Sequence, residues 1–387
     1  MGGLRITIQS SMEPKINLVD HPLAYPGNRF AAVHRVLADA VAAHAFPGCA
    51  FGVLAGGRIV HQGALGHFTY EAGAPVVSSD TVFDVASITK VVSTTAVAML
   101  LYQRGQLDID TPLGELLPGF VVGRAQGDRA RYVTLRHLLA HNSGLPGYVG
   151  FFRTAAKPAT LYRTCLELPL EAEPGTHAEY SDPGFILLGN ALEVLTNEYL
   201  ASWVRREVLD PLGMAKTCFC PTPEGRNQIP PTEEDTTFRH RRIQGEVQDE
   251  NAWLLRGAAG HAGLFSNVHD LLRFAEEILK PGRKTDLEKG MPSRFEATTV
   301  EFFAQRQGPK GSSRALGWDT PSENSTSGSH FSPNSIGHLG FSGCSLWIDR
   351  DADLAVVLLT NRTWPDRQSR LIREVWPVFH DAVREVI

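Results

Sequence analysis

The sequence has no surplus of positive charge, no long apolar run and few cysteines. Among its 387 residues, Lys and Arg number 37 and Asp and Glu number 42, which gives a formal net charge of −5. Proteins that bind nucleic acid neutralise phosphates with a surplus of basic residues, so this balance argues against that class. No run approaches the roughly 18 apolar residues of a membrane-spanning helix. We therefore expect a chain that binds neither nucleic acid nor a membrane.

The N-terminal segment and the cysteines point to a reducing compartment. The segment MGGLRITIQSSMEPKINLVDHP lacks the apolar core, at least about seven residues long, of a secretory signal. The cysteines are odd in number and scattered, and we interpret them as free thiols. The pair Cys218 and Cys220 lacks the second Cys/His pair of a zinc site, so no metal is expected. These features predict a cytoplasmic protein.

Three common signatures of hydrolases and nucleotide-binding proteins are missing. The chain contains no G-x-S-x-G, no H-E-x-x-H and no G-x-x-x-x-G-K-[ST]. The first marks α/β-hydrolases, the second zinc peptidases and the third P-loop proteins. Each of these classes therefore loses its main support.

Strand patterns occupy both ends of the chain, and helix patterns lie between them. Two β-rich runs flank Gly56-Gly57, and two further strands are predicted at 345–349 and 354–360. Helical periodicity marks 29–46, 87–104, 134–141, 184–198, 200–209, 267–280 and 366–386. Two stretches, 221–250 and 319–336, are predicted to be long loops.

The simplest arrangement of these elements is an α+β fold with one antiparallel sheet assembled from both chain ends. Residues 28–86 and 312–387 would form the sheet domain, with the terminal helices packed on the sheet. Residues 87–311 would form an inserted, mostly helical region. Residues 1–27 would be an N-terminal extension.

The motif Ser87-Ile88-Thr89-Lys90 is the first candidate for chemistry. None of the other lysines has a serine three residues before it. On a helix, this spacing places both side chains on one face, with about 5–6 Å between their Cβ atoms. The positive end of the helix would lower the pKa of Lys90, so that a neutral amine could take the Ser87 proton, and its N–H groups could hold an oxyanion. On the motif alone, an N-terminal cap serine with an ordinary surface lysine is the commoner explanation, because serine is a preferred cap.

Two later segments carry further candidates. Tyr180 leads into an apolar helix after a Pro-Gly turn, and a phenol beside cations can be held as phenolate or relay protons, although a lone tyrosine more often only packs. In Gly337-His338-Leu339-Gly340-Phe341, glycine on an edge strand lets a ligand approach the backbone. A backbone N–H there could complete an oxyanion hole. A second H-x-G at His261 reads as a loop, so we prefer His338.

These three elements, in this order, resemble the serine β-lactamase and penicillin-binding protein superfamily. They are most similar to its class C-like branch, which includes family VIII esterases and D-Ala-D-Ala peptidase homologues and carries S-x-x-K, then Y-x-N, then K-T-G or H-x-G. The flanks are also similar, over about residues 30–385: TVFDVASITKVVSTTAVAMLLYQRGQLDIDTPL, LRHLLAHNSGLPGY, EPGTHAEYSDPGFILLG and HLGFSGCSLWIDRDADLAVVLLTNR.

The resemblance implies a role for each matching residue. Ser87 would be the nucleophile that forms an acyl-enzyme, and Lys90 would activate it. Tyr180 would share the proton transfers to the leaving group and from the deacylating water. His338 would replace the usual lysine of the third motif, and the N–H groups of Ser87 and Phe341 would form the oxyanion hole. No cofactor is implied, since these side chains supply the proton transfers.

Departures from the family pattern bear on the substrate. Asp182 stands where the family usually has Asn, which removes an amide donor unless the carboxyl is protonated or salt-bridged. Leu339 replaces the Thr of K-T-G, and a neutral His338 removes a fixed cation. We place Asp182, Leu339 and Gly340 among the substrate-binding residues. The three changes argue against an efficient β-lactamase and favour an esterase for small uncharged substrates.

The leading functional hypothesis is therefore a serine carboxylesterase acting on small esters. One alternative is a D-Ala peptidase or muropeptide amidase, because DENAWLLRGAAGHAGLFS also resembles a segment of N-acetylmuramoyl-L-alanine amidases with this fold. A β-lactamase and a non-catalytic sensor that keeps the scaffold are the others. The expected partner is a small ester or amide substrate, and nothing in the sequence specifies an oligomeric state.

Overall fold

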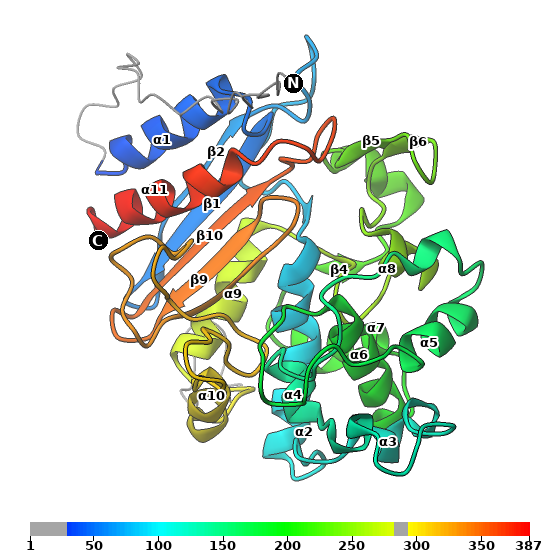
Figure 1. Ribbon diagram of the computed structural model, residues 1–387. Helices are drawn as coiled ribbons and strands as arrows, with labels where there is room; N and C mark the ends of the chain where they lie inside the picture. The colour runs from blue at the N-terminus through cyan, green and yellow to red at the C-terminus, as the bar shows by residue number, and fades with distance from the viewer. Residues whose placement is uncertain (1–28, 282–292) are drawn as a thin grey trace, which may run out of the picture.

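A five-stranded antiparallel sheet joins the two ends of the chain (Figure 1). The computed structural model describes residues 29–281 and 293–387, so the predicted extension 1–27 lies outside the described residues. The strand order is β2-β1-β10-β9-β8. The strands are β1 Gly48–Ala55, β2 Arg58–Gly66, β8 Ile336–Leu339, β9 Ser345–Asp349 and β10 Leu354–Thr360. The predicted α+β fold with a sheet from both ends is confirmed.

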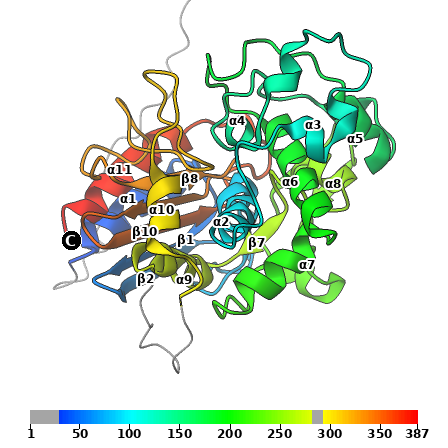
Figure 2. The ribbon, with the colours of Figure 1, turned by 90° about the horizontal axis from the view of Figure 1, so that it is seen from below.

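Both central strands are buried because helices cover both faces of the sheet. Along β1, Ala50 and Leu54 join one apolar cluster, whereas Phe51 and Val53 on the opposite face join another. Helices α1 (Ala31–Ala42) and α11 (Ile372–Arg384) lie side by side over one face, and α9 (Val268–Leu279) covers the other (Figures 1 and 2). The last helix, α11, begins at Ile372, several residues after the predicted start at 366.

The turn between β1 and β2 shows why glycine occupies both of its central positions. Gly56 and Gly57 have φ values of 58° and 74°. A two-residue hairpin turn with positive φ at both positions matches the twist of the flanking strands and strongly favours glycine or asparagine. The predicted hairpin is confirmed.

The segment after β2 crosses to a largely helical part of the molecule. Helix α2 (Ala96–Gln103) lies between the sheet and these helices (Figure 2). A small sheet of order β3-β7-β4 stands beside it, formed by Phe83–Asp84, Leu264–Ser266 and Cys218–Phe219. The other helices are α3 Leu113–Leu116, α4 Leu135–Leu139, α5 Pro158–Leu166, α6 Asp182–Thr196, α7 Leu200–Val204, α8 Glu250–Leu254 and α10 Ala297–Ala304. The domain boundaries at 86/87 and 311/312 stay predictions. Helix α9 belongs to the predicted inserted region 87–311, but it packs on the sheet.

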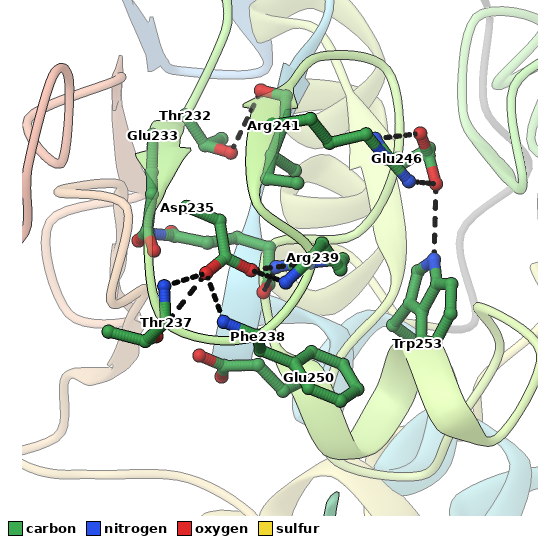
Figure 3. A network of polar contacts seen from close by, with 12 residues as sticks. Thr232, Glu233, Asp235, Thr237, Phe238, Arg239, Arg241, Glu246, Glu250 and Trp253 are labelled. Carbon is green, nitrogen blue, oxygen red and sulfur yellow. Dashed lines mark hydrogen bonds and ion pairs between the residues drawn. The ribbon is translucent and has the colours of Figure 1, made fainter.

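The stretch 221–250 is more ordered than the predicted long loop. It contains a hairpin of β5 (Glu233–Asp235) and β6 (Arg241–Ile243), shown with its polar contacts in Figure 3. Asp235 accepts hydrogen bonds from the backbone N–H groups of Thr237, Phe238 and Arg239 at 2.9–3.0 Å. Side-chain-to-backbone hydrogen bonds order this stretch, and apolar periodicity does not. Its polar composition therefore indicated a loop. The stretch 319–336 has no helix or strand until β8 begins at Ile336, so the predicted loop is correct up to its last residue.

A buried ion pair holds this hairpin against the rest of the chain. Arg239 contacts Asp235 at 2.9 Å, and both side chains are almost fully buried. The same guanidinium donates to the carbonyl oxygens of Val247 and Gln248 at 2.8 and 2.6 Å. Gln248 then donates its backbone N–H to Asp84 at 2.7 Å. The hairpin is thus linked to the segment that leads into Ser87.

No helix within 29–281 or 293–387 has both the length and the apolar character needed to cross a bilayer. All five cysteines are free, as predicted.

Candidate active site

A short 3₁₀ turn, Ala86–Ile88, presents Ser87 between β3 and the helix that follows. Ala86 has a φ of 47°, a conformation that costs a residue with a Cβ about 1–2 kcal/mol. The carboxylate of Asp84 accepts the N–H of Ala86 at 2.8 Å and the N–H of Gln248 at 2.7 Å. Since Asp84 is fully buried, these two bonds hold the strained turn in place. The side chain of Ser87 remains partly exposed.

Lys90 lies one helical turn after Ser87 and is fully buried, in a π-helical stretch, Lys90–Thr95. Its Nζ donates hydrogen bonds to Ser87 Oγ at 3.1 Å, to Asp182 Oδ1 at 2.7 Å and to the carbonyl oxygen of His261 at 3.2 Å. The structure therefore brings the first-motif pair together, as the helical spacing predicted. It also makes Asp182 an ion-pair partner of Lys90.

The expected lowering of the Lys90 pKa is wrong. Burial favours the neutral amine, but the charge of Asp182 and the hydroxyl of Tyr180 outweigh it, so the pKa of Lys90 is raised above its ordinary value. Lys90 therefore holds its proton in the resting site. The helix end alone would lower the pKa of Lys90. The carboxylate that reverses this direction belongs to Asp182, which lies 92 positions away in the sequence.

Tyr180 stands immediately before α6 and packs against the lysine. Its ring centre is 4.7 Å from Lys90 Nζ, and its hydroxyl is within hydrogen-bonding reach of Lys90 and Ser87. Ser181 caps α6 by accepting the N–H of Gly184 at 3.0 Å, which fixes the direction of the chain at this point. Burial raises the pKa of Tyr180, and Lys90 only partly opposes this. The phenol is therefore neutral at neutral pH, which suits a proton relay.

His338 lies on β8, the edge strand of the sheet, with its ring centre 5.9 Å from that of Tyr180. Its Nδ1 is 2.8 Å from the carbonyl oxygen of Leu339, so Nδ1 carries the proton and Nε2 is an acceptor. Burial, with the charges of Lys90 and Arg314, lowers the pKa of His338 well below its ordinary value. His338 is thus a neutral imidazole whose buried Nε2 has no partner among the described residues.

The turn after β8 packs directly on the segment that carries Ser87. A Cβ on Gly340 would stand 2.5 Å from the carbonyl oxygen of Val85, and Ser342 Oγ donates to the carbonyl oxygen of Asp84 at 2.7 Å. Within the described part of the chain, the backbone N–H groups of Ser87 and Phe341 donate to no protein acceptor. Arg362 holds the Phe341 peptide by donating from Nε to its carbonyl oxygen at 2.7 Å. Two free donors on mutually fixed segments suit an oxyanion hole.

The assignment of substrate contacts to Asp182, Leu339 and Gly340 stays a prediction, and the three residues lie in different settings. Asp182 is engaged by Lys90 at 2.7 Å, with 17% of its side chain exposed. Gly340 lies against the Val85 backbone. Leu339 packs against the cluster between the sheet and the terminal helices, so the structure does not bring its side chain to Lys90.

Two groups at the site were not singled out from the sequence. His261, set aside as a loop residue, supplies the carbonyl oxygen that holds Lys90, and its Nε2 is 2.8 Å from Asp249 Oδ1. His141 packs against Tyr180 with the rings tilted and 4.6 Å between their centres, and its Nδ1 accepts the N–H of Ser181 at 3.0 Å. His141 lies in the quoted segment LRHLLAHNSGLPGY and His261 in the second H-x-G, so both had a sequence signal.

Arg314 is a third such group, and no motif marked it. Its Cζ lies 5.1 Å from the ring centre of Tyr180. Backbone bridges join Arg314 to Asp319 and Asp319 to Gly337, which places it beside β8. Within the described residues its only ion pair is with Asp319, at 3.6 Å, so most of its N–H donors are unspent although the side chain is only 23% exposed. A half-buried cation therefore borders the site.

Within 29–281 and 293–387, no group of three or more His, Cys, Asp or Glu side chains is arranged to hold a metal ion. The expectation that no cofactor takes part stays a prediction.

Comparison with known proteins matches this site to a family. A sequence model described as Beta-lactamase matches residues 33–375, which is most of the chain. The chain belongs to the beta-lactamase family. The resemblance found in the three motifs is thereby confirmed at the level of the superfamily.

Members of the beta-lactamase family and related structures differ in their named activities. An N-acetylmuramyl-L-alanine amidase of Bacillus subtilis (strain 168) is 29% identical over 92% of this chain and 86% of its own. A putative D-alanyl-D-alanine carboxypeptidase of Salmonella paratyphi B is 29% identical over 80% of this chain and 77% of its own. The solved structure of EstCE1, a hydrolase with promiscuous acyltransferase activity, superposes with a TM-score of 0.73 at 22% identity, over 92% of this chain and 98% of its own. The likeness to EstCE1 shows that the two chains share a fold.

Proposed function

We propose that this beta-lactamase-family hydrolase works through an acyl-enzyme on Ser87 and that small carboxylic esters are its substrates. The observation that carries the proposal is the 3.1 Å hydrogen bond between Ser87 Oγ and the buried Lys90 Nζ. A serine whose oxygen contacts a buried proton carrier is the arrangement that nucleophilic catalysis requires.

Each residue then has a defined step. Ser87 Oγ attacks the ester carbonyl carbon while its proton passes to Lys90 Nζ, which transfers one of its own protons onward. The oxyanion forms between the N–H groups of Ser87 and Phe341, which are free to bind it. Tyr180 protonates the leaving alkoxide as the C–O bond breaks. Water then attacks the acyl-enzyme, and Tyr180 and Lys90 carry its proton back to Ser87.

Three features support an ester substrate over a β-lactam. Asp182 is a carboxylate paired with Lys90 and offers no amide N–H to a substrate carbonyl. His338 is neutral, so the third motif provides no cation. Leu339 has no hydroxyl, and its side chain packs away from Lys90. The fold shared with EstCE1, named as a hydrolase with acyltransferase activity, agrees with acyl transfer at such a site.

Arg314 favours a second candidate, a peptidase or amidase for substrates that carry a carboxylate. Its guanidinium borders Tyr180 with unspent donors, and a guanidinium binds a carboxylate through two parallel hydrogen bonds. The names of the two curated relatives, an amidase and a putative carboxypeptidase, agree with this candidate. In this case Arg314→Met should lower kcat/KM for an acidic peptide substrate at least tenfold relative to a neutral ester. Arg58→Met, at an exposed position, is the matched control.

The deciding experiment compares substrate classes on wild type and Ser87→Ala. The panel is p-nitrophenyl acetate, butyrate and octanoate, nitrocefin, an N-acetylmuramyl-L-alanyl peptide and a D-Ala-D-Ala peptide. We expect ester turnover that Ser87→Ala abolishes and that the exposed control Ser202→Ala retains. Strong nitrocefin turnover would instead identify a β-lactamase, and turnover of a peptide alone the second candidate. Failure of every substrate together with failure of fluorophosphonate labelling would favour a non-catalytic sensor.

A further inference from the structure

A resting site with a protonated lysine raises the question of where the Ser87 proton goes. Lys90 cannot take a proton from Ser87 while it holds three of its own. Three hydrogen bonds from Lys90 Nζ are resolved among the described residues. Of their acceptors, Ser87 Oγ is the proposed nucleophile and the His261 carbonyl oxygen is a weak base. The third, Asp182 Oδ1, is a carboxylate oxygen at 2.7 Å, the shortest of the three contacts. It is the one basic group with direct access to a lysine proton.

We propose that Asp182 is the terminal proton acceptor of the site and that Lys90 carries protons between it and Ser87. This inference rests on the proposed function and adds to it a residue that acts through Lys90. As Ser87 Oγ forms its bond to the carbonyl carbon, the Ser87 proton moves to Lys90 Nζ, and one Lys90 proton moves to Asp182 Oδ1. The oxyanion takes the negative charge that Asp182 gives up, so charge and protons balance. When the leaving group departs, Tyr180 donates to it, Lys90 reprotonates Tyr180, and Asp182 returns its proton to Lys90.

The surroundings of Asp182 suit a reversible acceptor. It is the first residue of α6, where the free N–H groups and the helix dipole stabilise a negative charge. Its backbone N–H donates to the carbonyl oxygen of Gly147 at 2.9 Å, so the main chain holds the residue in place whatever the state of the side chain. The side chain is 17% exposed, whereas that of Lys90 is not exposed at all. Asp182 is therefore the member of the pair that can exchange a proton with water.

Other charged and titratable groups near the pair come from several elements. Asp249 adds negative charge near Lys90 from the position just before α8, and Tyr148, in the loop after α4, interacts electrostatically with Asp182. His338 and Arg314 approach from the sheet side, and His141 and Tyr180 from the segments after α4 and before α6. Within the described residues, none of these groups contacts Lys90 Nζ with a carboxylate oxygen, and Tyr180 is a neutral phenol, so Asp182 is the strongest base in contact with Lys90.

Labelling of Ser87 by a fluorophosphonate isolates the activation step. Fluoride leaves without needing a proton, so the rate does not depend on protonation of a leaving group. Second-order labelling rates from pH 4.5 to 10.5 would be measured for wild type, Asp182→Asn and Asp182→Glu. Asp80→Asn, at an exposed position seven residues before Ser87, is the matched control. Thermal melts would show that all four proteins are folded.

We expect wild type to label at a constant rate from neutral pH upward. Asp182→Asn keeps a hydrogen-bond acceptor but cannot take a proton, so we expect a loss of about 100-fold at pH 6. Without the Asp182 charge, burial lowers the pKa of Lys90, so Asp182→Asn should regain activity as the pH rises through the titration of Lys90 itself. Asp182→Glu should recover much of the rate at pH 6.

Two results would overturn the inference. An Asp182→Asn profile that parallels wild type, lowered by one factor at every pH or not at all, would make Asp182 a positioning residue or a bystander. A wild-type protein that the probe does not label at Ser87 would overturn the proposed nucleophile, and this inference with it. The two failures are distinguishable because only the second removes labelling from wild type.

Discussion

Gly340 lies so close to Val85 that an added Cβ would stand 2.5 Å from the Val85 carbonyl oxygen. Val85 is two residues before Ser87, and Phe341 directly follows Gly340. This contact therefore sets the spacing between the two N–H groups proposed to bind the oxyanion. The distance between the two proposed oxyanion donors thus depends on the absence of one methyl group.

Gly340→Ala should separate the halves of the oxyanion hole. Because one misplaced donor costs about 10²–10³ in kcat, we expect kcat for p-nitrophenyl butyrate to fall about 100-fold while KM changes little. Gly127→Ala, where an added Cβ would meet open space, is the control. Full activity in Gly340→Ala would show that Phe341 does not contribute a donor.

Tyr180→Phe should affect esters according to their leaving group. A methyl ester expels an alkoxide that needs a proton, whereas p-nitrophenolate leaves unaided. We expect a fall of at least 100-fold in kcat/KM for methyl butyrate and a much smaller fall for p-nitrophenyl butyrate. Tyr199→Phe, at a position 74% exposed, should change neither rate. Equal losses on both esters would assign Tyr180 to activation of Ser87 instead.

Asp84 should make folding stability depend on pH. Burial is the main cause that raises its pKa to about 6 from 3.8, so the folded chain holds this proton more tightly than the unfolded chain. The associated stabilisation is present in full below about pH 4 and is lost as pH rises through 6. The whole shift corresponds to roughly 3 kcal/mol. We expect urea unfolding between pH 4 and 8 to show that wild type loses stability relative to Asp84→Asn as the pH rises. Parallel curves of unfolding free energy against pH would contradict this.

Arg239→Met should strongly destabilise the chain. It would leave the Asp235 carboxylate buried without its ion-pair partner, and breaking such a pair costs about 3–5 kcal/mol. Arg241→Met removes an ion pair with Glu246 from the same hairpin, but Arg241 is exposed, so the expected cost is about 1 kcal/mol or less. Urea denaturation of the two variants gives the comparison. A similar small loss in both would show that the buried pair is dispensable.

The sequence predicted the parts of the molecule that depend on local pattern. Short β-rich runs on either side of turn residues, within 48–66 and 345–360, predicted the strands. The spacing of Ser87 and Lys90 on one helix predicted their contact, which is 3.1 Å between Oγ and Nζ. Both are properties of a few neighbouring residues. The family and the α+β fold followed because three such local motifs occur in the right order.

The remaining features depend on contacts between distant segments, which carry no local signal. The ion pair of Lys90 with Asp182 reverses the expected pKa direction, and no spacing rule relates these two residues. Arg314 reaches Tyr180 only because its irregular segment pairs with Asp319 beside β8. Order in 221–250 depends on the buried Arg239–Asp235 pair, which polar composition alone did not indicate.

The pairing of β1 with β10 has a consequence for how the protein is made. Cys49 pairs with Thr360, so some 300 further residues are synthesised after β1 before its partner strand β10 exists. Ser87 leaves the ribosome long before Phe341. Contacts of such long sequence separation also slow folding. A nascent chain therefore carries the proposed nucleophile before the proposed oxyanion hole exists, and we expect no turnover until the segment around Phe341 has been made and has folded.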